Sequence, residues 1–339
     1  MVGALTARGI AVETVSVPRV SRSREMANLA LGVPYYRAKY FSPRNVALVR
    51  QAAEADAVVC SWEPLDLLAF ASGVKVIPIL HNITSRALPS MYPGNPATTM
   101  LAAGARQWER RAYGPGPFPL IGVLARQDEA AVTPSAGRER IVYLPPGLPP
   151  VAPLSPSAEL VRELAVLGTF GWRPKHRDLM RMANEYAGSP RPWTIFADEL
   201  PADARRLLSA RPWPEADASA ALRIGLVTDR FEAGHKLKVG SYIANNAVVV
   251  SYSDVRGEYR GMRHSDLFIR KIGHFSEIEA IYQELASMAP PVLRQRWLAF
   301  QQDCQQAFNW NGSARVLHEA LIGLRDSDPH HQRAQLPVE

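Results

Sequence analysis

The sequence predicts an α/β protein of two domains. Short apolar stretches such as Val74–Leu80 and Ala247–Val250 alternate with helix-forming segments. Strands that are apolar on both faces are typical of parallel sheets covered by helices. A proline-dense stretch from Pro145 to Pro156 interrupts the alternation, and neither a helix nor a sheet can continue through it. The 339 residues are enough for two domains of ordinary size.

The N-terminal half shows the alternation from its first residues. Residues 1–8 have the pattern of the end of a helix, whereas a Rossmann-like domain normally opens with a strand and a glycine-rich loop. We therefore expect the sequence to begin inside the first helix, so that either the first strand and its loop are missing or the true start lies upstream. From their apolar runs, the predicted strands are 11–17, 57–60, 74–80, 120–124 and 141–144, and the predicted helices are 46–55, 65–71 and 98–112.

The alternation restarts beyond the prolines. The predicted helices are 158–163, 176–186, 201–209, 276–288 and a final helical region over 291–324. The predicted strands are 165–170, 193–197, 247–250 and 267–271, together with a short strand that opens the segment Ala221–Ser251. The polar residues 326–339 form a tail that we expect to be disordered.

Composition limits the classes of function. A formal charge of +7 indicates affinity for anions such as nucleotide diphosphates or anionic lipid headgroups. The basic residues are dispersed among acidic ones, which argues against nucleic acid as a partner. The two cysteines form no motif, and we see no signal peptide and no apolar run of membrane-spanning length. A cytoplasmic protein is expected, and peripheral contact with the inner membrane face remains open.

The segment Ala221–Ser251 is the most informative part of the chain. It contains an apolar strand, a loop with Gly234, a helix that opens at His235-Lys236-Leu237-Lys238, and a second apolar strand. A helix N-terminus presents unpaired N–H groups and partial positive charge, which suit a phosphate. The two lysines of the first turn would hold a diphosphate there. The alternative is an ordinary βαβ crossover with solvated lysines.

This block resembles the nucleotide-sugar site of retaining glycosyltransferases of family 4, which have the GT-B architecture. The positions in register are Gly234, Lys236, Lys238, Val239, Ala244 and Val248-Val249-Val250. One position departs, since Ser241 stands where the family carries the glutamate that binds the donor ribose. Glu232, just before the glycine, is a candidate for the first acidic residue of the family's glutamate pair, displaced by one position.

Other segments resemble the same family in the same order. His81 ends the strand Val74–Leu80 and matches the histidine that faces the transferred sugar, although a strand-end histidine alone is also typical of a loop or a cap. Residues 168–175 resemble the opening loop of the nucleotide-binding domain. In that loop, Gly168 and Gly171 would let backbone amides approach phosphates, and Arg173 would either contact them or be solvated.

The resemblance implies a GT-B fold with two Rossmann-like domains facing across a cleft. It implies an acceptor-side domain over 1–148, a hinge over 149–158, a nucleotide-sugar domain over 159–300 and a C-terminal helix over 301–325 that packs back across the domains. The implied catalytic residues are His81 and Lys236, and the implied donor-binding residues are Gly168, Gly171, Arg173, Glu232, Gly234, Lys236, Lys238 and Ser241.

The implied activity is sugar transfer from a nucleotide diphosphate sugar to a small-molecule or lipid-linked acceptor. Transfer would retain the anomeric configuration and use neither a metal nor a further cofactor, and the sequence shows no metal-ligand spacing. Ser241 and the missing first strand keep an alternative open, in which the chain is a non-catalytic binding or scaffolding subunit related to glycosyltransferases.

Overall fold

The computed structural model describes residues 1–115, 118–189, 192–197, 199–212 and 221–326. The described chain divides into two compact units, each built on a parallel sheet. The first comprises Met1–Pro146, the three residues Ala233–His235 and the chain from Asn309 onward, and the second comprises Gly147–Glu232 and Lys236–Phe308. Most of the predicted tail, residues 327–339, lies outside the described residues.

The first unit has a four-stranded sheet in the order β1-β2-β3-β4, and each neighbouring pair is parallel. All five residues of β2 are buried, because this strand has a neighbour on each side. The elements are α1 (Val2–Thr6), α2 (Arg22–Ala30), α3 (Tyr35–Ala38), α4 (Pro43–Gln51), β1 (Val58–Cys60), α5 (Asp66–Ser72), β2 (Val76–Leu80), α6 (Thr84–Met91), α7 (Pro96–Tyr113), β3 (Ile121–Val123), α8 (Arg126–Ala136), β4 (Ile141–Tyr143) and α15 (Trp310–Asp326).

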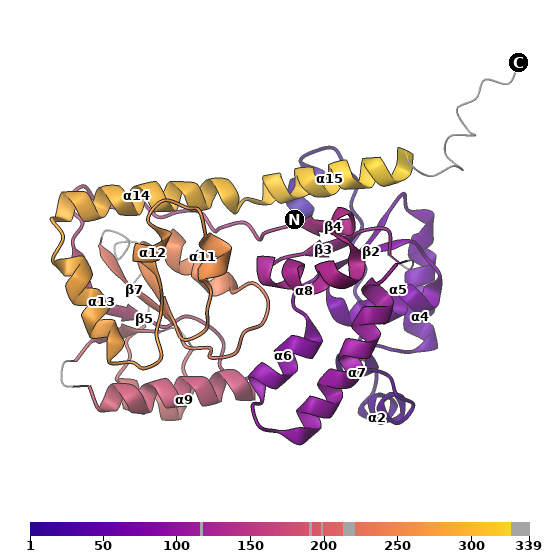
Figure 1. The fold of residues 1–339 in the computed structure, drawn as a ribbon, viewed down its shortest axis with the longest axis horizontal. Coiled ribbons are helices and arrows are strands. Elements are labelled where there is room, and N and C mark those ends of the chain that lie inside the picture. The colour runs from indigo at the N-terminus through magenta and orange to yellow at the C-terminus, as the bar shows by residue number, and fades with distance from the viewer. Residues whose placement is uncertain (116–117, 190–191, 198, 213–220, 327–339) are drawn as a thin grey trace, which may run out of the picture. The chain divides into compact units, whose positions relative to one another are not determined.

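The second unit has a five-stranded parallel sheet in the order β6-β5-β7-β8-β9. In Figure 1, α14 runs along one side of this sheet and α9 along the other. The elements are β5 (Leu160–Ala165), α9 (Arg173–Ala187), β6 (Thr194–Phe196), α10 (Ala202–Leu208), β7 (Leu222–Val227), α11 (Leu237–Ala244), β8 (Ala247–Ser251), α12 (Ser265–Phe268), β9 (Ile269–Lys271), α13 (Glu277–Ala286) and α14 (Pro290–Ala307).

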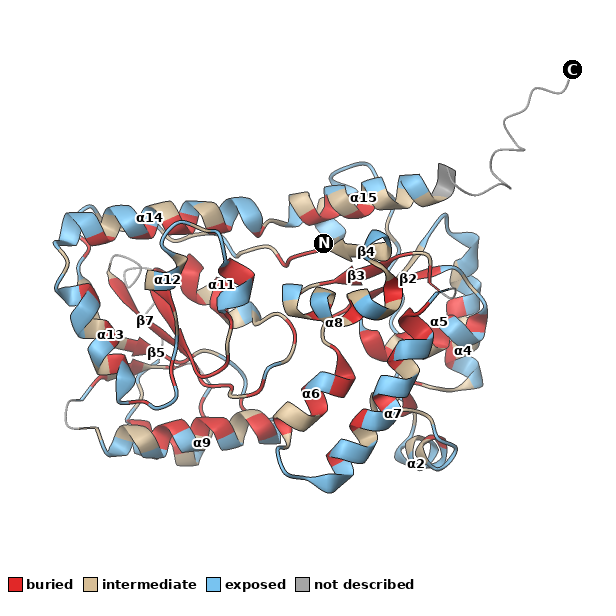
Figure 2. Cartoon of the chain, in the orientation of Figure 1, coloured by how far each residue is buried: buried red, intermediate tan, exposed pale blue. Residues whose placement is uncertain are grey.

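Burial follows the layers of each unit. The central strands β2, β3, β7 and β8 are buried, whereas edge strands such as β4 are half-buried, and the helices bury one face and expose the other (Figure 2). β7 and β8 are buried over their whole length, because each has strands on both sides and helices cover their faces. The carboxyl end of β7 opens into the loop that carries three of the predicted donor-binding residues, Glu232, Gly234 and Lys236.

Two predicted elements are wrong. Residues 11–17 form no strand, and Val15 is 46% exposed. Residues 158–163 were expected to be helical, yet Leu160–Ala165 is the strand β5, so the strand predicted over 165–170 begins and ends too late. In the sheet, Arg162 pairs with Glu279 of α13 and Glu163 lies 3.4 Å from Arg223 of β7.

Candidate functional site

The loop between β7 and α11 carries the second unit's candidate site. β7 ends at Val227, and α11 begins at Leu237 with Lys236 as its N-cap residue. Lys236 makes no side-chain cap hydrogen bond. Its ammonium group instead donates to the carbonyl oxygen of Phe231 at 3.1 Å and lies 4.0 Å from the centre of the Phe231 ring. The lysine therefore folds back over its own loop.

Both predicted lysines of this loop converge on one buried carboxylate. Lys238 Nζ lies 3.2 Å from Asp229 Oδ1, and Lys236 Nζ lies 3.7 Å from Asp229 Oδ2. The side chain of Lys238 is 11% exposed, that of Lys236 is 9% exposed and that of Asp229 is 2% exposed. Lys175, in the first turn of α9, acts electrostatically on the same carboxylate. We call these four residues the lysine cluster.

Burial dominates the electrostatics of the lysine cluster. It lowers the pKa of Lys236 to about 8, and the attraction of Asp229 offsets this only in part. Burial likewise lowers the pKa of Lys238. For Asp229, burial alone would raise the pKa, but the three lysines hold it below its usual value. Three ammonium groups around one carboxylate leave the cluster with excess positive charge at neutral pH.

A glycine leaves room at the Lys238 ammonium group. Gly168 follows β5 and has φ +134°, a conformation that side chains rarely adopt. A Cβ atom at this position would lie 3.3 Å from Lys238 Nζ. The glycine thus brings backbone close to the charged group, and its predicted role at the donor phosphates stays a prediction. Gly171 and Arg173 are both exposed, and a Cβ at Gly171 would meet nothing within 4 Å.

Tyr242 fixes α11 to the sheet beneath the cluster. Its hydroxyl donates to the carbonyl oxygen of Leu226 and accepts from the backbone N–H of Leu167, both at 2.8 Å. Its ring fills the space over Gly225, where a Cβ would come within 2.5 Å of the ring. One side chain therefore joins the lysine-bearing helix to the ends of β5 and β7.

Two predicted donor-binding residues lie on the same segment but outside the lysine cluster. Ser241 is half-buried on α11, one turn beyond Lys238, and Glu232 is exposed in the loop. The second unit thus brings Gly168, Lys236 and Lys238 together.

The first unit holds the other predicted catalytic residue. His81 directly follows β2, and its backbone N–H donates to Glu63 Oε2 at 3.2 Å. Gly234, in the three-residue segment that clusters with this unit, lies against the His81 carbonyl group. A Cβ on Gly234 would stand 2.0 Å from that oxygen, and Gln127 Nε2 donates to the Gly234 carbonyl oxygen at 3.0 Å. Gly234 therefore allows a close approach of two backbone segments.

Burial keeps this second group of side chains neutral. It lowers the pKa of His81, so the imidazole is uncharged at neutral pH. It raises the pKa of Glu63, which is 2% exposed, to about 8. A neutral imidazole at the carboxyl end of a parallel strand can exchange hydrogen bonds with a sugar hydroxyl.

Sequence reasoning missed Asp229 and Glu63. Both follow a parallel strand by two or three residues, at the edge where α/β proteins place ligands. The position of each residue just after a strand was the feature of the sequence that could have identified it as a candidate site residue. Asp229 lies in the segment that defined the lysines but is not one of the positions in register with the family, and Glu63 lies outside that segment.

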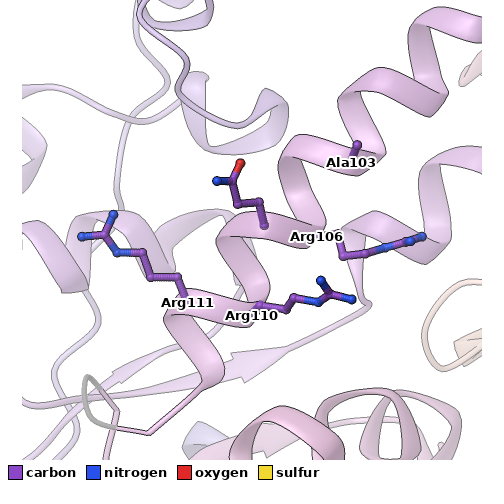
Figure 3. A pocket seen from close by; sticks show the side chains of 5 residues that line it. Ala103, Arg106, Arg110 and Arg111 are labelled. Carbon is purple, nitrogen blue, oxygen red and sulfur yellow. The ribbon is translucent and has the colours of Figure 1, made fainter.

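The first unit also has a pocket on the surface of α7. This shallow pocket is lined by Ala103, Arg106, Gln107, Arg110 and Arg111, whose side chains project from the helix surface (Figure 3). It includes none of the predicted site residues. Within the described ranges, no group of three or more His, Cys, Asp and Glu residues is placed to hold a metal ion. No described helix is both long and apolar enough to span a bilayer.

Comparisons with known proteins identify the architecture. No protein-family model and no curated protein sequence matches this chain. Solved structures do. A glycosyltransferase from Rickettsia africae has a TM-score of 0.58 at 8% identity, covering 96% of this chain and 88% of that one. The UDP-forming α,α-trehalose-phosphate synthase from Burkholderia xenovorans, in complex with glucose-6-phosphate, has a TM-score of 0.56 at 11% identity, covering 93% and 90%.

A third structure is Anabaena HepE in complex with UDP-glucose. Its TM-score is 0.55 at 14% identity, and the match covers 82% of each chain. The chain has the GT-B fold. The two parallel sheets described above are therefore the two Rossmann-like domains of that architecture, as the sequence predicted.

Proposed function

We propose that this protein is a glycosyltransferase that moves a sugar from a nucleotide diphosphate sugar to an acceptor. The GT-B fold supports this class of reaction, because similar structures include a synthase described as UDP-forming and a protein solved with UDP-glucose. The observation that carries the proposal is the lysine cluster. Its buried ammonium groups lie at the carboxyl end of the nucleotide-side sheet, where a diphosphate would bind.

The cluster fits the chemistry of the leaving group. Transfer breaks the bond between the anomeric carbon and a diphosphate oxygen, and the electron pair stays on that oxygen. The developing negative charge needs compensation, which Lys236 and Lys238 would supply in a water-poor site where electrostatic interactions are strong. In this proposal the lysines take the role that a divalent metal plays in other transferases.

We further propose retention of configuration, which rests on the resemblance to family 4. There the departing phosphate accepts the proton of the acceptor hydroxyl, so the new glycosidic bond forms on the face that the leaving group vacates. The neutral His81 would position the sugar or the acceptor through hydrogen bonds. The acceptor is proposed to be a small molecule or a lipid-linked molecule, and the site of action the cytoplasm, with peripheral contact at the inner membrane face.

Thermal stabilisation by a panel of nucleotides tests donor binding directly. Uridine, guanosine, adenosine and thymidine diphosphates and their glucose derivatives would be added with and without a chelator. We expect one base to raise the unfolding midpoint, whether or not the chelator is present. No shift with any of these nucleotides would contradict the proposal.

A lysine substitution then tests catalysis. Release of nucleoside diphosphate from the donor can be followed without a known acceptor, through slow hydrolysis. Lys236→Gln should reduce that release by about a hundredfold, because one charge-stabilising contact in the transition state is lost. Lys75→Gln removes an exposed lysine at the amino end of β2 and should leave the rate unchanged. Equal rates in Lys236→Gln and wild type would remove this lysine from the mechanism, and donor binding without any release would indicate a non-catalytic binding protein.

A further inference from the structure

Asp229 is an unexpected group for an anion-binding site. Its carboxylate is 2% exposed and lies 3.2 Å from Lys238 Nζ and 3.7 Å from Lys236 Nζ, so it takes up part of the charge that a phosphate would use. Burying a carboxylate costs free energy unless it is paired, and here the two ammonium groups provide that pairing. The loop thus carries a negative charge at the point where donor binding needs positive charge.

The charge of the lysine cluster distinguishes two related ligands. By formal charge, the three lysines Lys175, Lys236 and Lys238 and the one carboxylate of Asp229 sum to two positive units. The diphosphate of a nucleotide sugar is a diester with about two negative charges. The free nucleoside diphosphate has about three, because its terminal phosphate loses a second proton near pH 6. The cluster therefore matches the intact donor, and the free diphosphate brings one further negative charge towards Asp229.

We propose that Asp229 sets the selectivity of this site for the intact nucleotide diphosphate sugar over the nucleoside diphosphate that the reaction releases. The inference rests on the proposed function. Asp229 balances one lysine charge and repels the extra charge of the product, so the product leaves more readily while donor binding is preserved. A buried carboxylate is effective in this role because neither water nor salt screens it strongly.

A purely structural ion pair would behave differently. If Asp229 only held the lysines in place, its replacement would weaken or strengthen the binding of both ligands by the same factor. The informative quantity is the ratio of the two dissociation constants, because loss of folding or of lysine position cancels in it.

Two substitutions move the cluster charge in opposite directions. Asp229→Asn removes the negative charge of the carboxylate with little change in shape. Lys175→Gln lowers the cluster charge by one unit at a half-buried position of α9. Dissociation constants would be measured by calorimetry at pH 7.0 in the presence of a chelator. The probes are the nucleoside diphosphate that stabilises the wild type and its glucose derivative.

The two variants should give shifts of opposite sign. We expect Asp229→Asn to move the ratio about tenfold towards the nucleoside diphosphate, and Lys175→Gln to move it in the other direction. Lys75→Gln should leave it unchanged. Inorganic pyrophosphate, which needs no matching base, should bind Asp229→Asn about tenfold more tightly than wild type.

The outcomes separate this inference from the proposed function. If the wild type binds both ligands and neither variant changes the ratio, Asp229 has no role in selectivity, while donor binding stands. The same conclusion follows if the two variants shift the ratio in the same direction. If neither the wild type nor either variant binds any nucleotide or pyrophosphate, the proposed function fails, and the inference fails with it.

Discussion

Replacement of Gly234 by alanine should disrupt the loop before α11 more severely than an ordinary glycine substitution. The added Cβ would stand 2.0 Å from the His81 carbonyl oxygen, whereas such contacts are essentially never closer than 3.0 Å. The backbone must therefore move by about 1 Å, the difference between these distances. Gly234 also has φ +56°, where an alanine costs roughly 1–2 kcal/mol. With overpacking of about 1–3 kcal/mol, we expect a loss of about 3 kcal/mol.

Thermal unfolding would measure this loss, with two alanine variants of the same unit as controls. A loss of that size lowers the unfolding midpoint by about 5–10 °C in a domain of this size. Gly73 has φ +73° but nothing within 4 Å of its added Cβ, so Gly73→Ala isolates the backbone strain. Gly104 is an exposed residue inside α7 with open space around it, and Gly104→Ala should be neutral or stabilise by up to about 1 kcal/mol.

The unfolding midpoints of the three variants together test the close approach of Gly234 to His81. The midpoint of Gly234→Ala should lie clearly below that of Gly73→Ala, and its donor binding should weaken because Lys236 follows two residues later. Equal midpoints for these two variants, with unchanged donor binding, would refute the close approach of Gly234 to His81.

Two further predictions concern pH. The affinity for a nucleotide diphosphate sugar should be constant below pH 7 and fall as the pH rises through about 8, because Lys236 loses its proton there. In calorimetric titrations at several pH values, Lys236→Gln should show a smaller decline of affinity than the wild type. An affinity independent of pH up to 9 would contradict the assignment of Lys236 as a phosphate contact. Glu63 should make the wild type less stable than Glu63→Gln above pH 4.5, because its pKa rises to about 8 on folding. The difference in the free energy of unfolding between the two proteins should grow by about 1.4 kcal/mol per pH unit up to pH 8 and vanish near pH 4. Unfolding midpoints of the two proteins at pH 4, 6 and 8 test this, and parallel pH profiles would show that the carboxyl group is ionised in the folded protein.

Sequence patterns located most of the core elements because their signals are local. The strands predicted over 74–80 and 247–250 are rich in apolar residues, and the observed strands β2 (Val76–Leu80) and β8 (Ala247–Ser251) are fully buried. The strand predicted over 11–17 failed because β-propensity mainly reflects packing against neighbouring strands, and this segment pairs with none of the described strands. β5 was predicted too late in the sequence. Its charged residues Arg162 and Glu163 pair with residues that are distant in the chain, and a local pattern does not show such pairing.

The candidate site shows a similar division. The lysines and Gly168 could be predicted, because their spacing after apolar strands and before helices is visible in the sequence. The convergence of Lys236 and Lys238 on Asp229 could not, since it depends on how the loop folds back over Phe231. Likewise, the contact of Gly234 with the His81 carbonyl joins residues that are far apart in the chain, and no local pattern specifies it.

The packing of Tyr242 over Gly225 has an evolutionary consequence. A side chain at position 225 would occupy the volume of the Tyr242 ring. A smaller residue at position 242 would leave a cavity and remove the hydroxyl that forms hydrogen bonds at the ends of β5 and β7. Neither position can change alone without loss of stability. Homologues that retain the lysine-bearing helix should therefore keep both residues or replace them as a pair, and covariation of these two positions would trace the descent of this site.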